Sequence, residues 1–308
     1  MLFMLSDKLS ENTLRHIKKA IDEHRLPSLF IETVIQYYTP LAQWMALRIS
    51  QGQPHILGMQ GSQGSGKSTC AHFLQLLLEQ EFKLKVAVVS LDDFYLTKSE
   101  RTDLARKIHP LFETRGVPGT HDVALIQNTF DAVRNGKSVL VPTFDKAADD
   151  RLPISQWQSI ASDIDVLIFE GWCVGVPPQT ANQVPEAINA LESDDDPAAK
   201  WRSFVNDQLK CDYASIYSQL DTLVALQAPS FDCVFNWRLL QEQKLIARLE
   251  QAGKDFSGAQ TPEQIQRFIS HYQRLTEHAI ATMPDRADAL LHLNADHSFE
   301  KLVFRESG

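Results

Sequence analysis

The chain has 308 residues and a formal net charge of −9, because 30 Lys and Arg stand against 39 Asp and Glu. This acidic balance argues against nonspecific binding to nucleic acids or anionic membranes as the main role, but it leaves room for a local basic pocket. The N-terminus turns charged too early for a signal peptide, no apolar run is long enough to span a bilayer, and the four cysteines form no C-x-x-C pair. We therefore expect a cytoplasmic protein without a disulfide framework or a zinc site.

Residues 1–54 are predicted to form an N-terminal helical extension that packs on the core. Ser10 is a typical N-cap, and residues 10–24 carry apolar side chains spaced by three or four positions. The same period continues over residues 29–49, with a break expected near Pro40.

A pattern of alternating strands and helices begins at residue 55. The stretch HILGMQ (55–60) predicts a buried strand, and CAHFLQLLLEQ (70–80) predicts a helix that ends near Glu81. Between them lies GSQGSGKS (61–68), which matches the pattern G-x-x-x-x-G-K-[ST]. A strand, a glycine-rich loop and a helix in this order predict a nucleotide-phosphate site.

Each residue of this loop has a physical role in holding phosphate. The glycines let backbone N–H groups curl around phosphate oxygens, and the following helix points its positive dipole end at them. Lys67 is expected to reach the β- and γ-phosphates, and the Ser68 hydroxyl to ligate Mg²⁺. The expected nucleotide-binding residues are Gly61, Ser62, Gln63, Gly64, Ser65, Gly66, Lys67, Ser68 and Thr69.

Strands and helices continue to alternate along the rest of the chain, which predicts a parallel sheet covered by helices on both faces. Strands are predicted at residues 85–91, 137–144, 165–172, 221–229 and 288–296. Helices are predicted at residues 123–136, 231–253 and 261–284, with two short ones within 179–210. Loops are predicted at residues 102–122 and 145–153, and the acidic run ESDDD (192–196) is predicted to be a solvated loop.

Charged residues follow several of these strands at the point where each strand ends. The residues after the second, third and fourth strands are Asp92 and Asp93, Asp145 and Lys146, and Glu170, Gly171 and Trp172. Ligands of such sheets bind beyond the carboxyl ends of the strands, so we expect these side chains to converge on the phosphate loop. Asp92 could accept a proton from an attacking hydroxyl or hold Mg²⁺, and Glu170 could orient Mg²⁺ directly or through water.

The loops between the strands carry a further set of polar residues: Arg115, His121, Asp122, Lys146 and Arg151. Taken singly, each is an ordinary surface residue, and a loop histidine often only bonds nearby backbone. Taken together, in loops aimed at one edge of the sheet, they predict a pocket for a small polar anion.

Five sequence blocks follow the phosphate loop in order: SLDDFYL, RGVPGTHD, PTFDKAADDR, FEGWCVG and FNWRLLQE. Together they resemble the D-glycerate 3-kinase family, which is similar to phosphoribulokinase, uridine kinase and bacterial pantothenate kinase. The resemblance spans about residues 30–295 and is most discriminating in RGVPGTHD and FEGW. It implies an α/β fold of the P-loop NTPase type, with a parallel sheet sandwiched by helices, the helical extension at residues 1–54 and a kinase domain at residues 55–308.

The resemblance also implies a reaction, in which ATP and Mg²⁺ serve to phosphorylate an anionic hydroxy acid, D-glycerate, to 3-phosphoglycerate. The catalytic residues would be Lys67, Asp92, Glu170 and Arg238, with Arg238 as a lid residue over the phosphates. The metal would be held by Ser68, Asp92 and Glu170. The acceptor would be bound by Asp92, Tyr95, Arg115, His121, Asp122, Lys146, Arg151 and Trp172. Trp237, beside Arg238, fits a place in the same lid and a place in the core equally well.

Three positions depart from the residues frequent in that family: Val117 stands for Asn, Phe144 for Tyr and Asp149 for Gly. They leave the acceptor open among D-glycerate, a nucleoside, pantothenate and a sugar phosphate. A nucleoside would call for stacking side chains, for which Phe94, Tyr95 and Trp172 are candidates.

A slow ATPase that acts as a switch also stays open, whereas a GTPase is disfavoured because the chain has no N/T-K-x-D block. The sequence leaves the oligomeric state and the strand order open.

Overall fold

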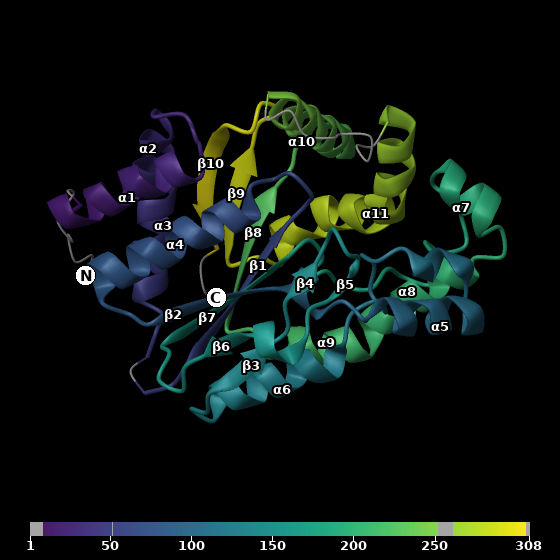
Figure 1. Ribbon diagram of the computed structural model, residues 1–308, viewed down its shortest axis with the longest axis horizontal. Coiled ribbons are helices and arrows are strands. Elements are labelled where there is room, and N and C mark those ends of the chain that lie inside the picture. The colour runs from purple at the N-terminus through teal and green to yellow at the C-terminus, as the bar shows by residue number, and fades with distance from the viewer. Residues whose placement is uncertain (1–8, 51, 252–260, 306–308) are drawn as a thin grey trace.

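Six strands form the central sheet, in the spatial order β10-β9-β8-β1-β7-β2. A computed structural model describes residues 9–50, 52–251 and 261–305 of the chain, and Figure 1 shows this sheet between two groups of helices. The strands are β1 (His55–Gly61), β2 (Val86–Ser90), β7 (Val166–Gly171), β8 (Thr222–Gln227), β9 (Ala289–Leu293) and β10 (Phe299–Phe304). Neighbours pair in parallel except β10, which runs antiparallel to β9. The predicted α/β class with a mostly parallel sheet is confirmed.

Successive side chains of the strands alternate between two buried clusters, one on each face of the sheet. In β7, Ile168 belongs to one cluster and Phe169 to the other, and Val224 and Ala225 divide in the same way in β8. The first cluster is completed by α1 (Glu11–Glu23), α3 (Thr39–Ala46), α4 (Lys67–Phe82) and α10 (Phe231–Gln251). The second is completed by α6 (Val123–Arg134), α8 (Lys200–Lys210), α9 (Asp212–Tyr217) and α11 (Pro262–Thr282).

The N-terminal helices follow the prediction at their start and depart from it in the middle. Ser10 caps α1 by accepting a hydrogen bond from the Thr13 N–H at 3.2 Å. The second predicted helix is divided into α2 (Phe30–Thr33), a π-helical turn (Val34–Tyr38) and α3. Pro40 lies in the first turn of α3 instead of breaking the helix, because proline lacks an N–H group that this turn does not need.

The later helices agree more closely with the sequence. Thr261 and Gln264 form a capping box at the start of α11, and Gly136 ends α6 with a φ of +60°. Residues 252 and 253, which were predicted to end the preceding helix, lie outside the described residues. Within the described ranges, no helix is both long and apolar enough to cross a membrane.

The segment between β2 and β7 differs most from the prediction. The predicted loop at 102–122 contains most of α5 (Lys98–Lys107), which a Thr97–Glu100 capping box begins, and a 3₁₀ turn (Pro110–Glu113). The predicted third strand is not part of the central sheet. It is divided between β3 (Val139–Val141), which pairs with β6 (Gln158–Ile160), and β4 (Phe144–Asp145), which pairs with β5 (Asp150–Arg151). Pro142 lies between the two pieces and cannot donate to a sheet ladder, which explains the division.

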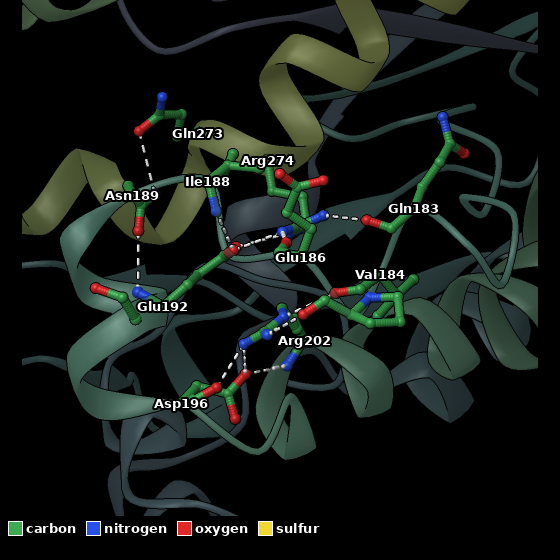
Figure 2. A network of polar contacts seen from close by, with 12 residues as sticks. Gln183, Val184, Glu186, Ile188, Asn189, Glu192, Asp196, Arg202, Gln273 and Arg274 are labelled. Atoms are coloured by element: carbon green, nitrogen blue, oxygen red, sulfur yellow. Dashed lines mark hydrogen bonds and ion pairs between the residues drawn. The ribbon is translucent and has the colours of Figure 1, made fainter.

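Two buried arginine–carboxylate pairs hold the segment between β7 and α8, and Figure 2 shows their network. Arg274 of α11 donates to Glu192 with an Nε–Oε1 distance of 2.7 Å, and Arg202 of α8 contacts Asp196 with an Nη1–Oδ2 distance of 2.9 Å. Glu192 lies in α7 (Ala190–Asp195) and is 0% exposed, and Asp196 is 1% exposed. The predicted solvated loop at 192–196 is therefore wrong at both of its ends, because each acid has a buried arginine partner.

Candidate active site

The phosphate loop lies between the carboxyl end of β1 and the first turn of α4, at the centre of the sheet. Gly64 and Gly66 have φ angles of +77° and +84°, a region that L side chains rarely adopt. At Gly61, an added Cβ would lie 2.6 Å from the Ser65 Oγ and 3.2 Å from the Lys67 Cβ, so the loop folds back closely on this position. This geometry wraps the backbone around the space in front of the α4 dipole, where a phosphate is favoured.

Several side chains of this loop have polar atoms that are buried without a hydrogen-bond partner. They are the hydroxyls of Ser62 and Ser65, both 3% exposed, and the Gln63 Oε1. Buried polar groups are normally paired, so unpaired ones at a loop of this shape fit a site for phosphate oxygens and their counter-ions.

Glu170 lies at the end of β7 and is joined to the phosphate loop by a direct contact. The Ser68 Oγ donates to its Oε1 at 2.9 Å, while its Oε2 is buried without a partner. Magnesium in nucleotide sites takes one or two protein oxygens and completes its shell with phosphate and water oxygens. The Ser68 hydroxyl and the Glu170 carboxylate therefore fit a Mg²⁺ ion.

Asp92 lies beyond the end of β2, in a 3₁₀ turn (Leu91–Phe94). Its Oδ2 accepts from Lys146 Nζ at 2.6 Å and its Oδ1 from the Tyr95 hydroxyl at 3.0 Å. Burial acts to raise the pKa of Asp92, but the positive charges of Lys146 and Lys67 and these two hydrogen bonds outweigh it and bring the pKa to about 2. Asp92 is therefore an ionised carboxylate at neutral pH.

The adjacent acid, Asp93, has a different environment. Its Oδ1 accepts from the backbone N–H of Phe144 at 3.2 Å, so this side chain holds the β4–β5 hairpin. Burial raises the pKa of Asp93 to about 6, and the nearby Asp92 charge acts in the same direction. The two neighbouring acids thus differ in their contacts and in the direction in which their pKa values are shifted.

Lys146 reaches Asp92 by a route that the sequence did not predict. It lies in the turn of the β4–β5 hairpin, not at the end of a strand of the central sheet. The argument from strand ends was therefore wrong for Asp145 and Lys146, although Lys146 still points to the same place. The Asp145 carboxylate instead accepts from the backbone N–H groups of Ala147 and Ala148 and closes this turn.

A cavity of about 350 Å³ lies beside the phosphate loop and brings many of the predicted residues together. Its lining combines a carboxylate, four cationic side chains and several aromatic rings. The lining residues are Gln63, Gly64, Lys67, Asp92, Tyr95, Arg115, Lys146, Trp172, Arg238, Phe268 and Tyr272. Phe268 and Tyr272 were missed, because on the sequence they belong to the apolar stripe of an ordinary amphipathic helix.

Three predicted acceptor residues do not line this cavity but lie behind Tyr95. His121 stacks on the Tyr95 ring at a centroid distance of 4.6 Å, and its Nδ1 shares a 2.6 Å hydrogen bond with the Tyr213 hydroxyl. Burial lowers the pKa of His121 to about 3. Arg151 donates to the Tyr95 carbonyl at 2.9 Å and pairs with Asp122, which caps α6. These residues fix the position of Tyr95 from behind.

Arg115 and Trp172 form another part of the cavity wall. The Trp172 Nε1 donates to the Gly116 carbonyl at 2.9 Å, and its ring meets the Tyr272 ring edge-on at 4.9 Å. Arg115 pairs with Asp149 and lies 5.4 Å from the centre of the Phe144 ring. The aromatic groups therefore hold the RGVPG loop against α11.

Arg238 lies on α10 at the rim of the cavity and pairs with Glu242 one turn later at 2.8 Å. Its neighbour Trp237 is 2% exposed, and the Trp237 Nε1 donates to the Ala295 carbonyl at 2.7 Å. The burial of Trp237 favours core packing over a role in the lid.

A second cavity of about 350 Å³ opens at the carboxyl ends of β8 and β9. Its lining residues are Gln227, Ala228, Pro229, His292, Leu293, Asn294, Ala295 and Glu300. The turn after β9 also contacts the phosphate loop, because the His297 Nε2 donates to the Gly64 carbonyl at 2.9 Å. Two cavities therefore lie near the phosphate loop.

The model of the phosphoribulokinase / uridine kinase family matches residues 56–185 of this chain. An uncharacterized kinase of Schizosaccharomyces pombe is 35% identical to it over 259 residues, which cover 79% of this chain and 86% of that protein. The chain belongs to this family of P-loop kinases. The kinase is therefore a phosphotransferase with a hydroxyl acceptor.

Two further relatives carry a named activity. The chloroplastic D-glycerate 3-kinase of Arabidopsis thaliana is 28% identical over 272 residues, which cover 82% of the kinase but only 56% of that relative. The D-glycerate 3-kinase of Cryptococcus neoformans superimposes with a TM-score of 0.73 at 24% identity, over 87% of the kinase and 97% of that chain. The predicted P-loop fold and the resemblance to D-glycerate 3-kinases are both confirmed.

Proposed function

We propose that this kinase transfers the γ-phosphoryl group of ATP to D-glycerate, giving ADP and 3-phosphoglycerate. The observation that carries the proposal is the cavity beside the phosphate loop, where the Asp92 carboxylate lies among cationic side chains. A carboxylate suits the hydroxyl of an acceptor, and the cations suit its negative charge. The same acceptor is named for the A. thaliana relative.

The phosphate loop and Lys67 would hold the phosphates of ATP. Backbone N–H groups between Gly61 and Ser68 would surround the phosphate oxygens, and Lys67, at the start of α4, lines the cavity beside the loop. Ser68 and Glu170 would hold Mg²⁺, which when bound neutralises charge on the phosphate oxygens.

The cavity at the ends of β8 and β9 would take the nucleoside end of ATP. It lies beside the phosphate loop through the His297–Gly64 contact, and its lining offers Asn294 and Gln227 for polar groups and Pro229 and Leu293 for an apolar face. This assignment leaves the cavity of Asp92 for the acceptor, on the other side of the transferred phosphoryl group.

Asp92 would hold the acceptor hydroxyl at the phosphoryl group. Each of its oxygens accepts one hydrogen bond, from Lys146 or Tyr95, and a carboxylate oxygen has room for a second. The loose transition state of phosphoryl transfer needs mainly positioning and charge stabilisation, which a fixed carboxylate and nearby cations provide. Arg115 would bind the carboxylate of the acceptor.

Two helices would shield this arrangement from water. Arg238 of α10 and the aromatic pair Phe268 and Tyr272 of α11 line the cavity on one side. Exclusion of water protects the phosphoryl group from hydrolysis and strengthens charge interactions within the site. Arg238 would contact the phosphates as the lid residue.

The test is the release of ADP from ATP–Mg²⁺ in the presence of D-glycerate, L-glycerate, uridine, pantothenate or ribulose 5-phosphate, with the product identified by mass spectrometry. We expect D-glycerate alone to raise turnover well above the rate without acceptor. Asp92→Asn should lower this turnover by at least about 10²-fold with little change in the KM for ATP. Asp145→Asn is the matched control, because Asp145 closes the neighbouring turn and does not line the cavity.

If another acceptor in the panel raises turnover instead, that molecule replaces D-glycerate as the proposed substrate, and the proposed phosphoryl transfer at Asp92 is kept. If ATP is hydrolysed at the same rate with and without acceptors and no phosphorylated product forms, the result would support the slow ATPase hypothesis instead. Full activity of Asp92→Asn with D-glycerate would remove Asp92 from its proposed role.

A further inference from the structure

One carboxylate beside the acceptor cavity, that of Asp149, contacts two cationic side chains. Lys146 pairs with Asp92 at 2.6 Å, and Arg238 pairs with Glu242 at 2.8 Å. Asp149 instead serves two cations. Its Oδ2 accepts from the Arg101 Nη2 at 2.7 Å, and its Oδ1 accepts from the Arg115 Nη1. The group of Arg101, Arg115 and Asp149 therefore carries one net positive charge.

The two arginines of this group have different freedom. Arg101 is 1% exposed and also donates to the carbonyls of Leu96 at 2.7 Å and of Asp149 at 2.9 Å. It is held within the protein and cannot turn toward a ligand. The Arg115 side chain is 23% exposed and lines the cavity. Arg115 is thus the member of the group that faces the cavity.

Asp149 stays with this pair because of its backbone as well as its charge. It occupies the turn between β4 and β5 with a φ of +55°, in the left-handed region that Asp and Asn tolerate better than most side chains. The turn places its carboxylate between the two guanidinium groups. The carboxylate both positions Arg115 and cancels half of the charge of the arginine pair.

We propose that Asp149 determines the charge of the acceptor that this kinase selects. With Asp149 in place, the arginine pair offers one net positive charge, which matches a singly charged carboxylate. The second negative charge of a phosphate dianion finds no further net positive charge in the arginine pair, because Asp149 cancels it. The inference rests on the proposed function, because it takes this cavity as the acceptor site.

The size of the effect follows from electrostatics. One unit charge a few ångströms beyond Arg115, at the effective dielectric constant of a partly buried site, changes the affinity for one further charge by about tenfold or more. Removing Asp149 should therefore favour dianions over monoanions by about this factor.

The experiment compares wild type with Asp149→Asn, since Asn keeps the shape of Asp and its tolerance of the left-handed backbone. The control is Asp150→Asn, the next residue of the hairpin, whose Oδ1 accepts from the backbone N–H groups of Lys98 and Arg151. Both variants lose the same charge. The kcat and KM are measured separately for D-glycerate and for ribulose 5-phosphate and glycerol 1-phosphate, which carry the dianionic group.

We expect Asp149→Asn to raise the ratio of kcat/KM for the phosphorylated alcohols over D-glycerate by about tenfold. The change should lie in the KM for the acceptor, with the KM for ATP unchanged. Asp150→Asn should keep the wild-type ratio. A lower melting temperature in Asp149→Asn with an unchanged ratio would show that Asp149 has only a structural role and would overturn the inference.

A binding measurement separates this inference from the proposed function. Glycolate and glycerol 1-phosphate are titrated into each variant with ADP–Mg²⁺ present, and the affinities are read by calorimetry. If wild type phosphorylates no D-glycerate but Asp149→Asn still shifts the affinity ratio toward the dianion, the proposed substrate fails and the role of Asp149 stands. If D-glycerate is the substrate and the affinity ratio does not move, the role of Asp149 fails alone.

Discussion

The molecule holds charged side chains in two ways, and the network of Figure 2 and the acceptor cavity represent them. In the network, Arg274 and Glu192 are 7% and 0% exposed, and the remaining N–H groups of Arg274 reach carbonyls such as that of Gln183 at 2.9 Å. In the cavity, the side chains of Lys146 and Arg115 are 62% and 23% exposed. The charged groups of the network are paired within the protein, and we call them the closed network. Those of the cavity are partly exposed and can still donate hydrogen bonds to a ligand, and we call them the open cluster.

The difference shows what each set of charges can do. A buried ion pair with every partner present resists any change, because the loss of one partner leaves an uncompensated charge in a low-dielectric interior. A partly exposed pair can exchange partners at little cost, since water and long side chains adjust around it. The closed network therefore holds α11 in place, and the open cluster can take up a ligand.

The largest expected effect is on catalysis and concerns Lys67, which lines the cavity of the open cluster. Lys67→Ala should lower kcat by about 10³-fold, because the charge on the transferred phosphoryl group loses its nearest cation. The free energy of unfolding should change by less than about 1 kcal/mol. Steady-state kinetics and urea unfolding of the same preparation check both parts. A large loss of stability would mean that the open cluster also holds the fold together.

The next effect is on stability and concerns the Glu192–Arg274 pair of the closed network. Glu192→Gln keeps the shape of the side chain but leaves the Arg274 charge buried without its counter-charge, so the free energy of unfolding should fall by about 3–5 kcal/mol. The folded fraction should keep the wild-type KM for ATP. Urea unfolding gives the first value and steady-state kinetics the second.

Asp195→Asn is the matched control, three residues along the same acidic run. Its partner Arg267 lies at 2.8 Å, but both side chains are well exposed, so the expected loss is about 0–1 kcal/mol. Equal losses for the two variants would contradict the distinction between closed and open pairs.

The smallest effect concerns His121, which is buried like the network but lies behind the cavity. Burial lowers its pKa to about 3 in the folded state, whereas the unfolded value is about 6.5. Between these values the unfolded chain binds more protons, so wild type should lose up to about 1.4 kcal/mol of stability at this residue for each pH unit below about 6.5. His121→Asn should lack this contribution. The stability difference between the two proteins, measured by urea unfolding at about pH 7, 6 and 5, should therefore change with pH, and parallel curves would show that His121 does not titrate in this way.

Local patterns sufficed for the parts of the fold and site that local physics determines. The phosphate loop, the strands around it and the capped helices α1 and α11 have short-range signals, such as the glycines at Gly64 and Gly66 and the caps at Ser10 and Thr261. Asp92 and Glu170 were found because the first follows an apolar strand and the second lies at the end of another. These features need only a few neighbouring residues.

The remaining features depend on partners far away in sequence. Glu192 and Asp195 belong to one acidic run, but Glu192 is buried against Arg274 whereas Asp195 pairs with Arg267 at the surface. Tyr272 is one apolar residue of a long helix until α11 packs beside the RGVPG loop. No spacing in the sequence carries this information, because it arises when the chain folds.

The contact between His297 and the phosphate loop joins residues 233 positions apart. The strand that leads into the loop pairs with β7 and β8, which are made much later, and the Ser68–Glu170 bond spans 102 positions. During synthesis, the phosphate loop therefore leaves the ribosome long before the residues that support it. We therefore expect a chain that ends before the turn after β9 to lack this support of the phosphate loop and to bind nucleotide more weakly than the full chain.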